Sequence, residues 1–444
     1  FKSNIGLNNR DRRYSRQVNG GFDLAIPGFY HLSNITTIPD YFEINRRSRS
    51  MSVFGQIDLV YKDYLFLNIT GRNDWNSVLP EANRSFFYPS VGVAFIPTKA
   101  FPELKTKFFH KAKLSASYVK TGNATALESQ QVPIVAVNDT FYPDTGLVAL
   151  VANNEIVDQN IKNEFINSFE ANVNLEFLNI RGPRITLDAS AAFGRNTDQI
   201  LNISSSSATG FTNALINVGE TTSNSLEVDL GFTPFKTQDF ELNGRVGFST
   251  FKTIVEKVTD QSDQVEVLGT GGTIGSYAIE GEEFPLLLGT AYDRDDQGRV
   301  LVDADGVPLI AAGLQKLGKT TPDYILNFSL NAKYKGFRFA AVADYRTGHV
   351  FYSGIRNQLS GQGRTIESTY NDRLPFVFPN STVEGSGVDN TTVLTANTGS
   401  AFGPGLDPEV HPYGFAYDYY TGDHNNIDEN FITDATAFKL REVS

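Results

Sequence analysis

The sequence predicts an all-β fold, a transmembrane antiparallel β-barrel, from three observations. Hydrophobic and polar residues alternate with a period of two, the alternating runs extend over roughly ten residues, and short connections alternate with long ones. A period of two indicates strands, because successive side chains of a strand leave its opposite faces. Strands that cross a membrane need about nine to eleven residues, whereas strands of a soluble sandwich average about five or six. The run length therefore favours the membrane barrel.

Alternation is clearest in five segments: 57–62 (IDLVYK), 185–193 (ITLDASAAF), 226–232 (LEVDLGF), 327–334 (NFSLNAKY) and 337–345 (FRFAAVADY). One face of each predicted strand is apolar and is expected to meet lipid. The polar residues of these and neighbouring strands are expected to line an aqueous interior: Asp58, Asn68, Asn172, Asn174, Glu176, Asp188, Glu227, Asp229, Asn327, Asn331, Lys333, Arg338 and Asp344. Aromatic residues that end the runs occupy the place of an interfacial girdle: Tyr61, Tyr64, Phe177, Phe232, Tyr334 and Phe337.

Connection lengths predict the topology. Short connections are expected at 62–64, 178–183, 233–238 and 335–336, with a medium one at 97–110. Long connections are expected at 73–88, 121–166, 197–222, 252–321 and 347–434, if 283–313 forms a hairpin within its own loop. Outer-membrane barrels have short periplasmic turns and long outer loops, so the long connections are predicted to face the cell exterior. About eleven strands result, which is half of a large barrel.

Composition excludes several classes of protein. The formal net charge of the 444-residue chain is -12, so it is a poor nucleic-acid binder, since a phosphate backbone must be met by basic groups. The absence of cysteine removes disulfides, thiol nucleophiles and Cys-ligated metal sites. No run of apolar residues is long enough for a membrane-spanning helix, which needs about 18 or more.

A set of segments then matches a known family in order along nearly the whole chain. The longest are LNITGRNDWNSVLPEANRSFFYPSVGVAFIP (67–97), KAKLSASYVKTGN (111–123), NSFEANVNLEFLNIRGPRITLDASAAFGRNTDQIL (167–201), NVGETTSNSLEVDL (217–230), GTAYDRDDQGRVLVDADGVP (289–308), LGKTTPDYILNFSLNAKYKGFRFAAVADYRTG (317–348) and FKLREVS (438–444). Together they resemble the SusC/RagA-like branch of TonB-dependent outer-membrane transporters.

The resemblance implies a 22-stranded barrel that imports a large nutrient, either a glycan or a peptide. It also implies an N-terminal plug, energisation through TonB and a SusD-like surface lipoprotein as a lid. Residues 1–444 are then expected to form one partial barrel domain, an internal fragment, with the plug, the TonB box, the early strands and the last strands outside it. The alternative is a non-transporting barrel that acts as a scaffold or anchor in a larger surface complex.

Sequence motifs for catalysis, nucleotide binding or metal binding are weak, and no enzyme is predicted. GLQKLGKT (313–320) matches the phosphate-binding P-loop pattern as text, but Pro322 and the alternation after it leave no room for the required helix. The five histidines, His31, His110, His349, His411 and His424, show no ligand spacing and are expected in exposed loop positions. No GxSxG motif and no distinctive carboxylate pair is present.

An acidic segment suggests one ion site. Asp293, Asp295, Asp296, Asp303 and Asp305 would offer several carboxylates to calcium, although the bidentate Glu of an EF-hand is replaced by Ala304. The alternative, which we favour, is a hairpin whose DDQG and DADG sequences form turns. Apart from this calcium, no cofactor is expected.

Aromatic residues supply the remaining candidates. Trp75 could stack on a sugar, but its parity with Leu65, Leu67 and Ile69 favours the outer girdle or loop packing. Within HPYGFAYDYYTGDH (411–424), five rings are expected either to contact cargo or the lid, or to pack as loop core: Tyr413, Phe415, Tyr417, Tyr419 and Tyr420.

Overall fold

A computed structural model of the chain describes residues 1–20, 23–36, 40–123, 135–138, 149–152, 155–178, 183–204, 208, 210–211, 213–259, 262–269, 273–304, 306–373, 376–391, 393–394 and 419–444. The chain forms two compact units. The first contains Phe1–Leu175 and Ala192–Thr222, and the second contains Glu176–Ala191 and Ser223–Ser444. Within the described ranges, no helix is both long and apolar enough to cross a membrane.

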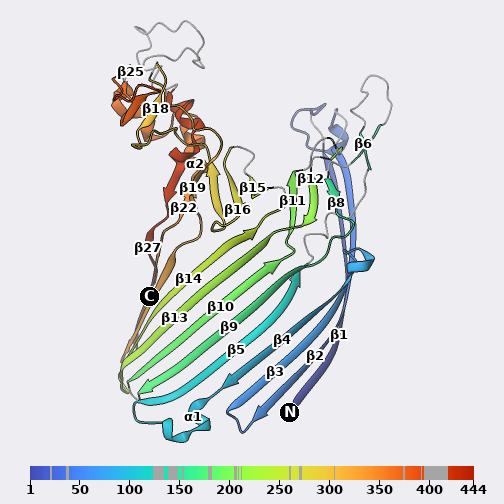
Figure 1. Cartoon of the computed structure of the whole chain (residues 1–444), viewed down its shortest axis with the longest axis vertical. Helices are drawn as coiled ribbons and strands as arrows, with labels where there is room; N and C mark the ends of the chain where they lie inside the picture. Colours follow the sequence, from blue (N-terminus) through green and yellow to red (C-terminus); the bar gives the residue numbers. More distant parts are fainter. Residues whose placement is uncertain are drawn as a thin grey trace. The chain divides into compact units, whose positions relative to one another are not determined.

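Long antiparallel strands form the main sheet, and each is hydrogen-bonded to the next in chain order, as Figure 1 shows. Their order is β1-β2-β3-β4-β5-β9-β10-β13-β14-β20-β21-β27. The bounds are β1 (Lys2–Gly20), β2 (Asp40–Tyr61), β3 (Leu65–Asn76), β4 (Ser85–Phe95), β5 (Phe109–Asn123), β9 (Glu164–Leu178), β10 (Arg184–Thr197), β13 (Glu220–Lys236), β14 (Phe240–Lys257), β20 (Tyr324–Tyr334), β21 (Phe337–Thr347) and β27 (Ala437–Val443). The sheet has 12 strands in the described part of the chain, close to the predicted eleven.

Tight turns join neighbouring strands where the sequence predicts them. The β2–β3 turn contains Lys62 and Asp63 with φ of 46° and 57°, and the β20–β21 turn contains Lys335 and Gly336 with φ of 47° and 99°. Two successive residues with positive φ make the turn type that matches the twist of paired strands. The residues that flank each turn are paired, which fixes the register of the two strands. In the β2–β3 turn, for example, Tyr61 lies opposite Leu65.

The two faces of the strands differ as the alternation predicts. On one face Ile57, Leu59 and Ile69 are each about 40% exposed, and Leu330 on β20 is 39% exposed. On the other face lie hydrogen-bonded polar side chains, with Asp58 directly opposite Asn68. A row of half-exposed aliphatic side chains on regular strands is the surface expected of a lipid-facing band.

Aromatic rings gather at the tight-turn ends of the strands. Tyr64 makes edge contacts with Tyr61 at 5.5 Å and with Phe95 at 6.1 Å between ring centroids. In the second unit Phe240 packs against Tyr334, while Phe337 is 80% exposed. Exposed rings at one level of the strands are typical of the membrane interface.

Several boundaries differ from the sequence prediction. The connection expected at 73–88 is shorter, because Trp75 still pairs with Ser85 and the ladder continues to the ends of β3 and β4. Strand β13 likewise continues to Lys236, into the turn predicted at 233–238. Strands β1 and β2 have 19 and 22 residues, longer than a bilayer requires.

Short elements fill the connections. Helices and turns of 3-10 helix are α1 (Pro97–Ala100), α2 (Gly354–Ser360), η1 (Leu32–Asn34), η2 (Glu81–Asn83), η3 (Pro102–Leu104), η6 (Ile366–Arg373), η7 (His424–Asn426) and η8 (Asp428–Phe431). The minor strands are β6 (Val135–Asn138), β7 (Ala149–Ala152), β8 (Glu155–Val157), β11 (Ile200–Ser204), β12 (Asn213–Asn217), β15 (Gln264–Gly269), β16 (Gly275–Ile279), β17 (Leu286–Gly289), β18 (Val300–Val302), β19 (Gln315–Lys319), β22 (Val350–Tyr352), β23 (Phe376–Val377), β24 (Ser381–Val383), β25 (Val393–Leu394) and β26 (Ile432–Asp434).

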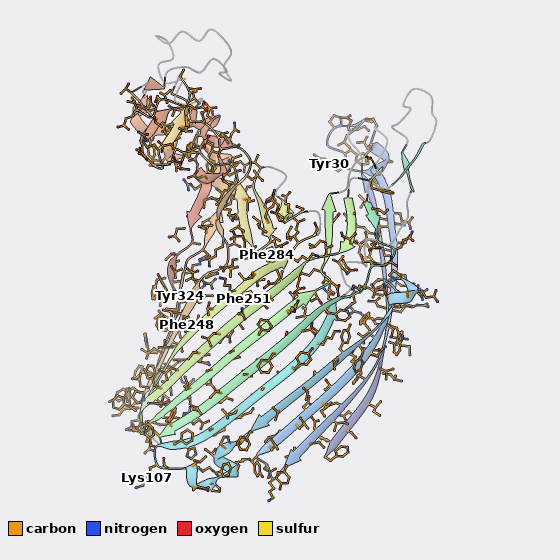
Figure 2. All side chains as sticks on the ribbon, in the orientation of Figure 1. Tyr30, Lys107, Phe248, Phe251, Phe284 and Tyr324 are labelled. Atoms are coloured by element: carbon orange, nitrogen blue, oxygen red, sulfur yellow. The ribbon has the colours of Figure 1, made fainter. Side chains whose placement is uncertain are left out.

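The buried clusters lie in these connections and at the strand ends next to them, rather than along the middle of the strands. In the first unit, Leu79, Phe86, Ile161 and Leu215 belong to one buried cluster. In the second unit, Val255, Val258 and Ala278 form another, with Phe284 packed against it. Figure 2 labels Phe284, and it also labels Phe248 and Tyr324 of the main sheet, whose rings lie 5.8 Å apart.

Candidate functional site

Polar side chains of the first unit form a network on one face of β2, β3 and β4. The carboxylate of Asp58 accepts hydrogen bonds from Asn68 at 2.6 Å and from Gln56 at 2.9 Å. On the next strands the hydroxyls of Thr70 and Ser90 are 2.6 Å apart. These groups satisfy one another across strands, as polar groups on a water-facing wall do.

The second unit continues this pattern with charged pairs. Arg245 donates to Asp229 at 2.9 Å, and Arg346 donates to Asp344 at 3.0 Å. Asp344 is only 5% exposed and also accepts a hydrogen bond from Arg441 of β27. All thirteen residues predicted to line the interior lie on strands of the main sheet. Whether they meet water in the native protein stays a prediction.

The longest connections of the second unit fold on each other, and we call the described residues 264–319 and 350–434 the loop module. Asp428 accepts hydrogen bonds from the hydroxyl of Thr273 at 2.5 Å and from the backbone N–H of Thr290 at 3.0 Å. The neighbouring Glu429 forms a bidentate pair with Arg294 at 2.7 and 3.0 Å. Bidentate guanidinium–carboxylate pairs are among the stronger polar contacts, so η8 holds the two segments together.

Aromatic side chains of the loop module surround a cavity of about 310 Å³. Its lining includes Tyr292, Phe376, Phe378, Tyr419, Tyr420 and Asn430. Tyr419 and Tyr420 are 4% and 5% exposed, and Phe376 and Phe378 pack against them. Burial raises the pKa of the Tyr419 hydroxyl well above its usual range and that of Tyr420 to about 12. For these two rings the loop-core alternative fits, because side chains so buried offer no surface to a partner.

His424 also lines this cavity, which corrects the expectation of an exposed loop histidine. Its ring lies 5.3 Å from Tyr420 and 5.5 Å from Phe431, and its Nδ1 is buried without a hydrogen-bond partner. Burial lowers the pKa of His424 to about 4, so the ring is neutral at pH 7. Tyr413, Phe415, Tyr417 and His411 lie outside the described residues.

The acidic segment forms two consecutive turns inside the β17–β19 hairpin. Asp295 accepts from the backbone N–H of Gln297 and Arg299 at 2.9 Å, and Asp303 accepts from Val307 at 2.9 Å. Arg299 also pairs with Asp295 at 2.7 Å. No three ligating side chains gather at a metal-binding distance within the described ranges, which omit Asp305. These contacts favour the turn alternative, and calcium binding at Asp293, Asp295, Asp296, Asp303 and Asp305 stays a prediction.

Two further motifs have clear positions. Trp75 is 41% exposed beside Met51 on the apolar face, in the position expected of a girdle residue. In the P-loop-like segment strand β19 replaces the glycine-rich loop, and strand β20 follows where a P-loop needs a helix. Its Lys319 pairs with Glu283 at 3.0 Å and with Asp323 at 2.5 Å. This geometry provides no phosphate cradle.

Residues 2–375 match the family model described as TonB dependent receptor-like, beta-barrel. The chain belongs to this family. The TonB-dependent receptors are outer-membrane proteins of Gram-negative bacteria that act as receptors and transporters and not as enzymes. The predicted fold class is confirmed.

Two curated relatives come from Formosa agariphila. TonB-dependent receptor P26 is 27% identical over 376 residues, which are 78% of this chain and 37% of the relative. TonB-dependent receptor P3 is 24% identical over 320 residues, 65% of this chain and 30% of the relative. The chain thus spans about a third of the length of these relatives.

Solved structures share the fold. The RagAB peptide importer in its closed-closed state superposes with a TM-score of 0.64 at 17% identity, over 81% of this chain and 40% of that one. The RagAB peptide transporter gives a TM-score of 0.63 at 16% identity, over 81% of this chain and 43% of that one. These matches show that the fold is shared.

Sequence reasoning missed one feature of the first unit. Although the chain as a whole is acidic, seven arginines lie in the paired segments 10–16 of β1 and 46–49 of β2, which we call the upper parts of these strands. They are Arg10, Arg12, Arg13, Arg16, Arg46, Arg47 and Arg49. The signal was visible in the segments RDRRYSR (10–16) and NRRSRS (45–50). These segments lack the apolar alternation that indicates a strand, so that pattern does not predict that they belong to β1 and β2.

Proposed function

We propose that the native protein is an active importer of a large nutrient, a glycan or a peptide, energised through TonB. The observation that supports it best is the polar face of the main sheet, where ionic side chains such as Asp58, Asp229 and Asp344 are held in hydrogen-bonded networks. Charges on the inside of a membrane barrel are stable only where they meet water or a plug. A wall of this kind suits a path for polar cargo.

A SusD-like lipoprotein as lid and a plug inside the barrel complete the proposal. Its support is the loop module, which is folded by its own contacts around η8 instead of being a simple connector. Structureless loops longer than about 12–15 residues are uncommon, and long folded ones are usually functional. The solved RagAB structures are described as a peptide importer, and they include closed-closed and open-open states. We expect the lid to dock on the loop module of this protein.

Uptake of labelled oligomers by the native organism tests the proposal. Cells with and without the protein are compared for retention of fluorescent oligosaccharides and peptides, before and after loss of TonB. An importer predicts uptake that needs both the protein and TonB. A scaffold, the alternative function, predicts equal uptake in all strains, together with loss of surface complexes when the protein is removed.

Purification of the native complex tests the lid separately. We expect a surface lipoprotein to be retained at about one copy per barrel and to dissociate when residues 350–434 are replaced by a short linker. Retention of the lipoprotein by the shortened protein would place the lid elsewhere.

A further inference from the structure

The first unit contains a polar hollow on the polar face of β1, β2 and β3, with a volume of about 250 Å³. Its origin is the pairing register, in which Arg10 lies opposite Ser50 and Arg12 opposite Ser48. Ser50 in turn lies opposite Asn76 of β3. Two small serines between long side chains leave a space that is floored by hydroxyls and walled by guanidinium groups.

Positive charge dominates this hollow. Its lining includes the guanidinium groups of Arg10, Arg12, Arg49 and Arg72 and one carboxylate, that of Asp74, while Arg49 pairs with Asp11 outside the lining at 3.0 Å. Asp74 is already paired with Arg72 at 2.6 Å. Among the described residues, Arg10 has no ion-pair partner. The guanidinium group of Arg10, on the same face of β1 as that of Arg12, offers a site for an anion, because forked guanidinium donors match oxyanions.

A second observation points to a ligand in the same hollow. Asn163 lines it, is only 2% exposed, and its amide oxygen has no hydrogen-bond partner. Gly122 permits this position, since a Cβ there would lie 2.0 Å from Asn163 Nδ2. A buried acceptor without a donor is costly unless water or a ligand supplies one.

The hollow lies beyond the membrane band, on the side of the long connections. It begins above Met51, which pairs with Trp75 at the end of the apolar face. Its residues Arg10, Arg12, Ser48 and Ser50 share the polar face with Asp58 and Asn68, whereas Arg49 belongs to the opposite face and reaches the hollow from its edge. Cargo that enters along this face would meet the arginines first.

We propose that this hollow is a subsite for an anionic group of the cargo, a carboxylate or a sulfate ester next to a hydroxyl or N–H donor. The proposal rests on the proposed import function and specifies its substrate class as acidic oligomers. The oxyanion accepts hydrogen bonds from the guanidinium groups of Arg10 and Arg12. The neighbouring hydroxyl or N–H of the cargo donates to the amide oxygen of Asn163.

Direct binding to the purified native protein tests this subsite without transport. The probes are fluorescent tetraglutamate and a sulfated disaccharide, each paired with its neutral counterpart, tetraglutamine or the unsulfated sugar. We expect at least one anionic probe to bind about tenfold or more tightly than its neutral counterpart, with an affinity that falls as salt rises. The two arms separate carboxylate from sulfate as the preferred group.

Matched double variants locate the site on one face of the hairpin. Arg10→Gln with Arg12→Gln removes two inward charges, and we expect affinity for the anionic probe to fall about tenfold or more. Arg13→Gln with Arg47→Gln removes two outward charges from the same strands, where Arg47 pairs with Asp11 at 2.6 Å, and should change affinity less than about twofold. Heat-resistant mobility on a gel checks that both variants are folded.

Two results would overturn the subsite. Equal binding of anionic and neutral probes would exclude it, and equal losses in the two double variants would show a general field rather than a site. Binding of the anionic probe without any cellular uptake would instead contradict the import function and leave the subsite in place.

Discussion

Asp428 and Thr290, which are 138 positions apart in the chain, exchange hydrogen bonds in both directions. The backbone N–H of Thr290 donates to the Asp428 carboxylate at 3.0 Å, and the backbone N–H of Asp428 donates to the Thr290 hydroxyl at 2.9 Å. The hydroxyl of Thr273 donates to the same carboxylate. The Asp428 side chain, which is only 5% exposed, therefore joins the segments around Thr273, Thr290 and Asp428 in the loop module.

Replacing Asp428 should loosen the loop module and leave the barrel strands intact. In Asp428→Ala, two hydroxyls and a backbone N–H lose a charged acceptor, which should cost about 2–4 kcal/mol of local stability. Hydrogen exchange should speed up in β16, β17 and η8 but not in β20 or β21. The control Asp389→Ala removes an exposed carboxylate of the same module that pairs only at the surface with Arg299, and should change little. Equal effects of the two variants would contradict the role of Asp428.

The loop module should weaken in acid through His424. Its folded-state pKa of about 4 lies below the ordinary 6.5, so the unfolded segment takes up a proton first as pH falls. The contribution of neutral His424 to the stability of the loop module is therefore fully present above about pH 6.5. It is lost progressively as the pH falls toward 4, by about 3 kcal/mol in total. Glu367 opposes the shift and Arg356 reinforces it, while burial dominates.

Hydrogen exchange of the module at pH 7 and pH 5 measures this effect. His424→Gln should remove most of the difference between the two pH values. Comparison with that variant cancels other groups, such as Asp423, whose pKa is raised by burial and whose contribution has the opposite sign. The same acid sensitivity in the variant would show that another group is responsible.

The lipid-facing and water-facing sides of β20 should respond differently to charge. Leu330 is 39% exposed on the apolar face, and Leu330→Arg should destabilise the folded barrel by about 2–4 kcal/mol near the bilayer midplane. Asn331, opposite Asn243 on the polar face, should tolerate arginine with little loss. Refolding titrations into lipid vesicles measure both, and similar penalties would mean that the faces are assigned wrongly.

Chelation decides the calcium prediction. Since Asp295 and Asp303 already accept backbone N–H groups of their own turns, we expect EGTA to leave hydrogen exchange of residues 293–309 unchanged. Asp293→Asn with Asp295→Asn should then loosen the turns with or without calcium. Faster exchange after chelation, matched by the double variant, would instead establish a calcium site.

Local chemistry made the strands predictable. The parity of Asp58 and the turn at Lys335–Gly336 follow from alternation and from residues that accept positive φ, and both are confirmed. Pairing beyond the apolar band was not predictable in this way. The upper parts of β1 and β2 are held by cross-strand pairs such as Asp11–Arg47, and a period of apolar residues cannot reveal those pairs.

The loop module shows the other limit. Its contacts, such as Asp428 with Thr290 and Glu429 with Arg294, join residues far apart in the chain that carry no shared motif. The composition of the tyrosine run (411–424) fits a buried core and a contact surface equally well. Only the burial of Tyr419 and Tyr420 separates the two for those residues.

Cysteine labelling on intact cells tests most directly the claim that these strands form a membrane-spanning wall with the long connections outside. The chain has no cysteine, so each introduced thiol reports one position. A membrane-impermeant maleimide should label Asp389→Cys in the loop module and should not label Gly336→Cys in the β20–β21 turn until the outer membrane is broken. Labelling of Gly336→Cys on intact cells, with Asp389→Cys protected, would contradict the account.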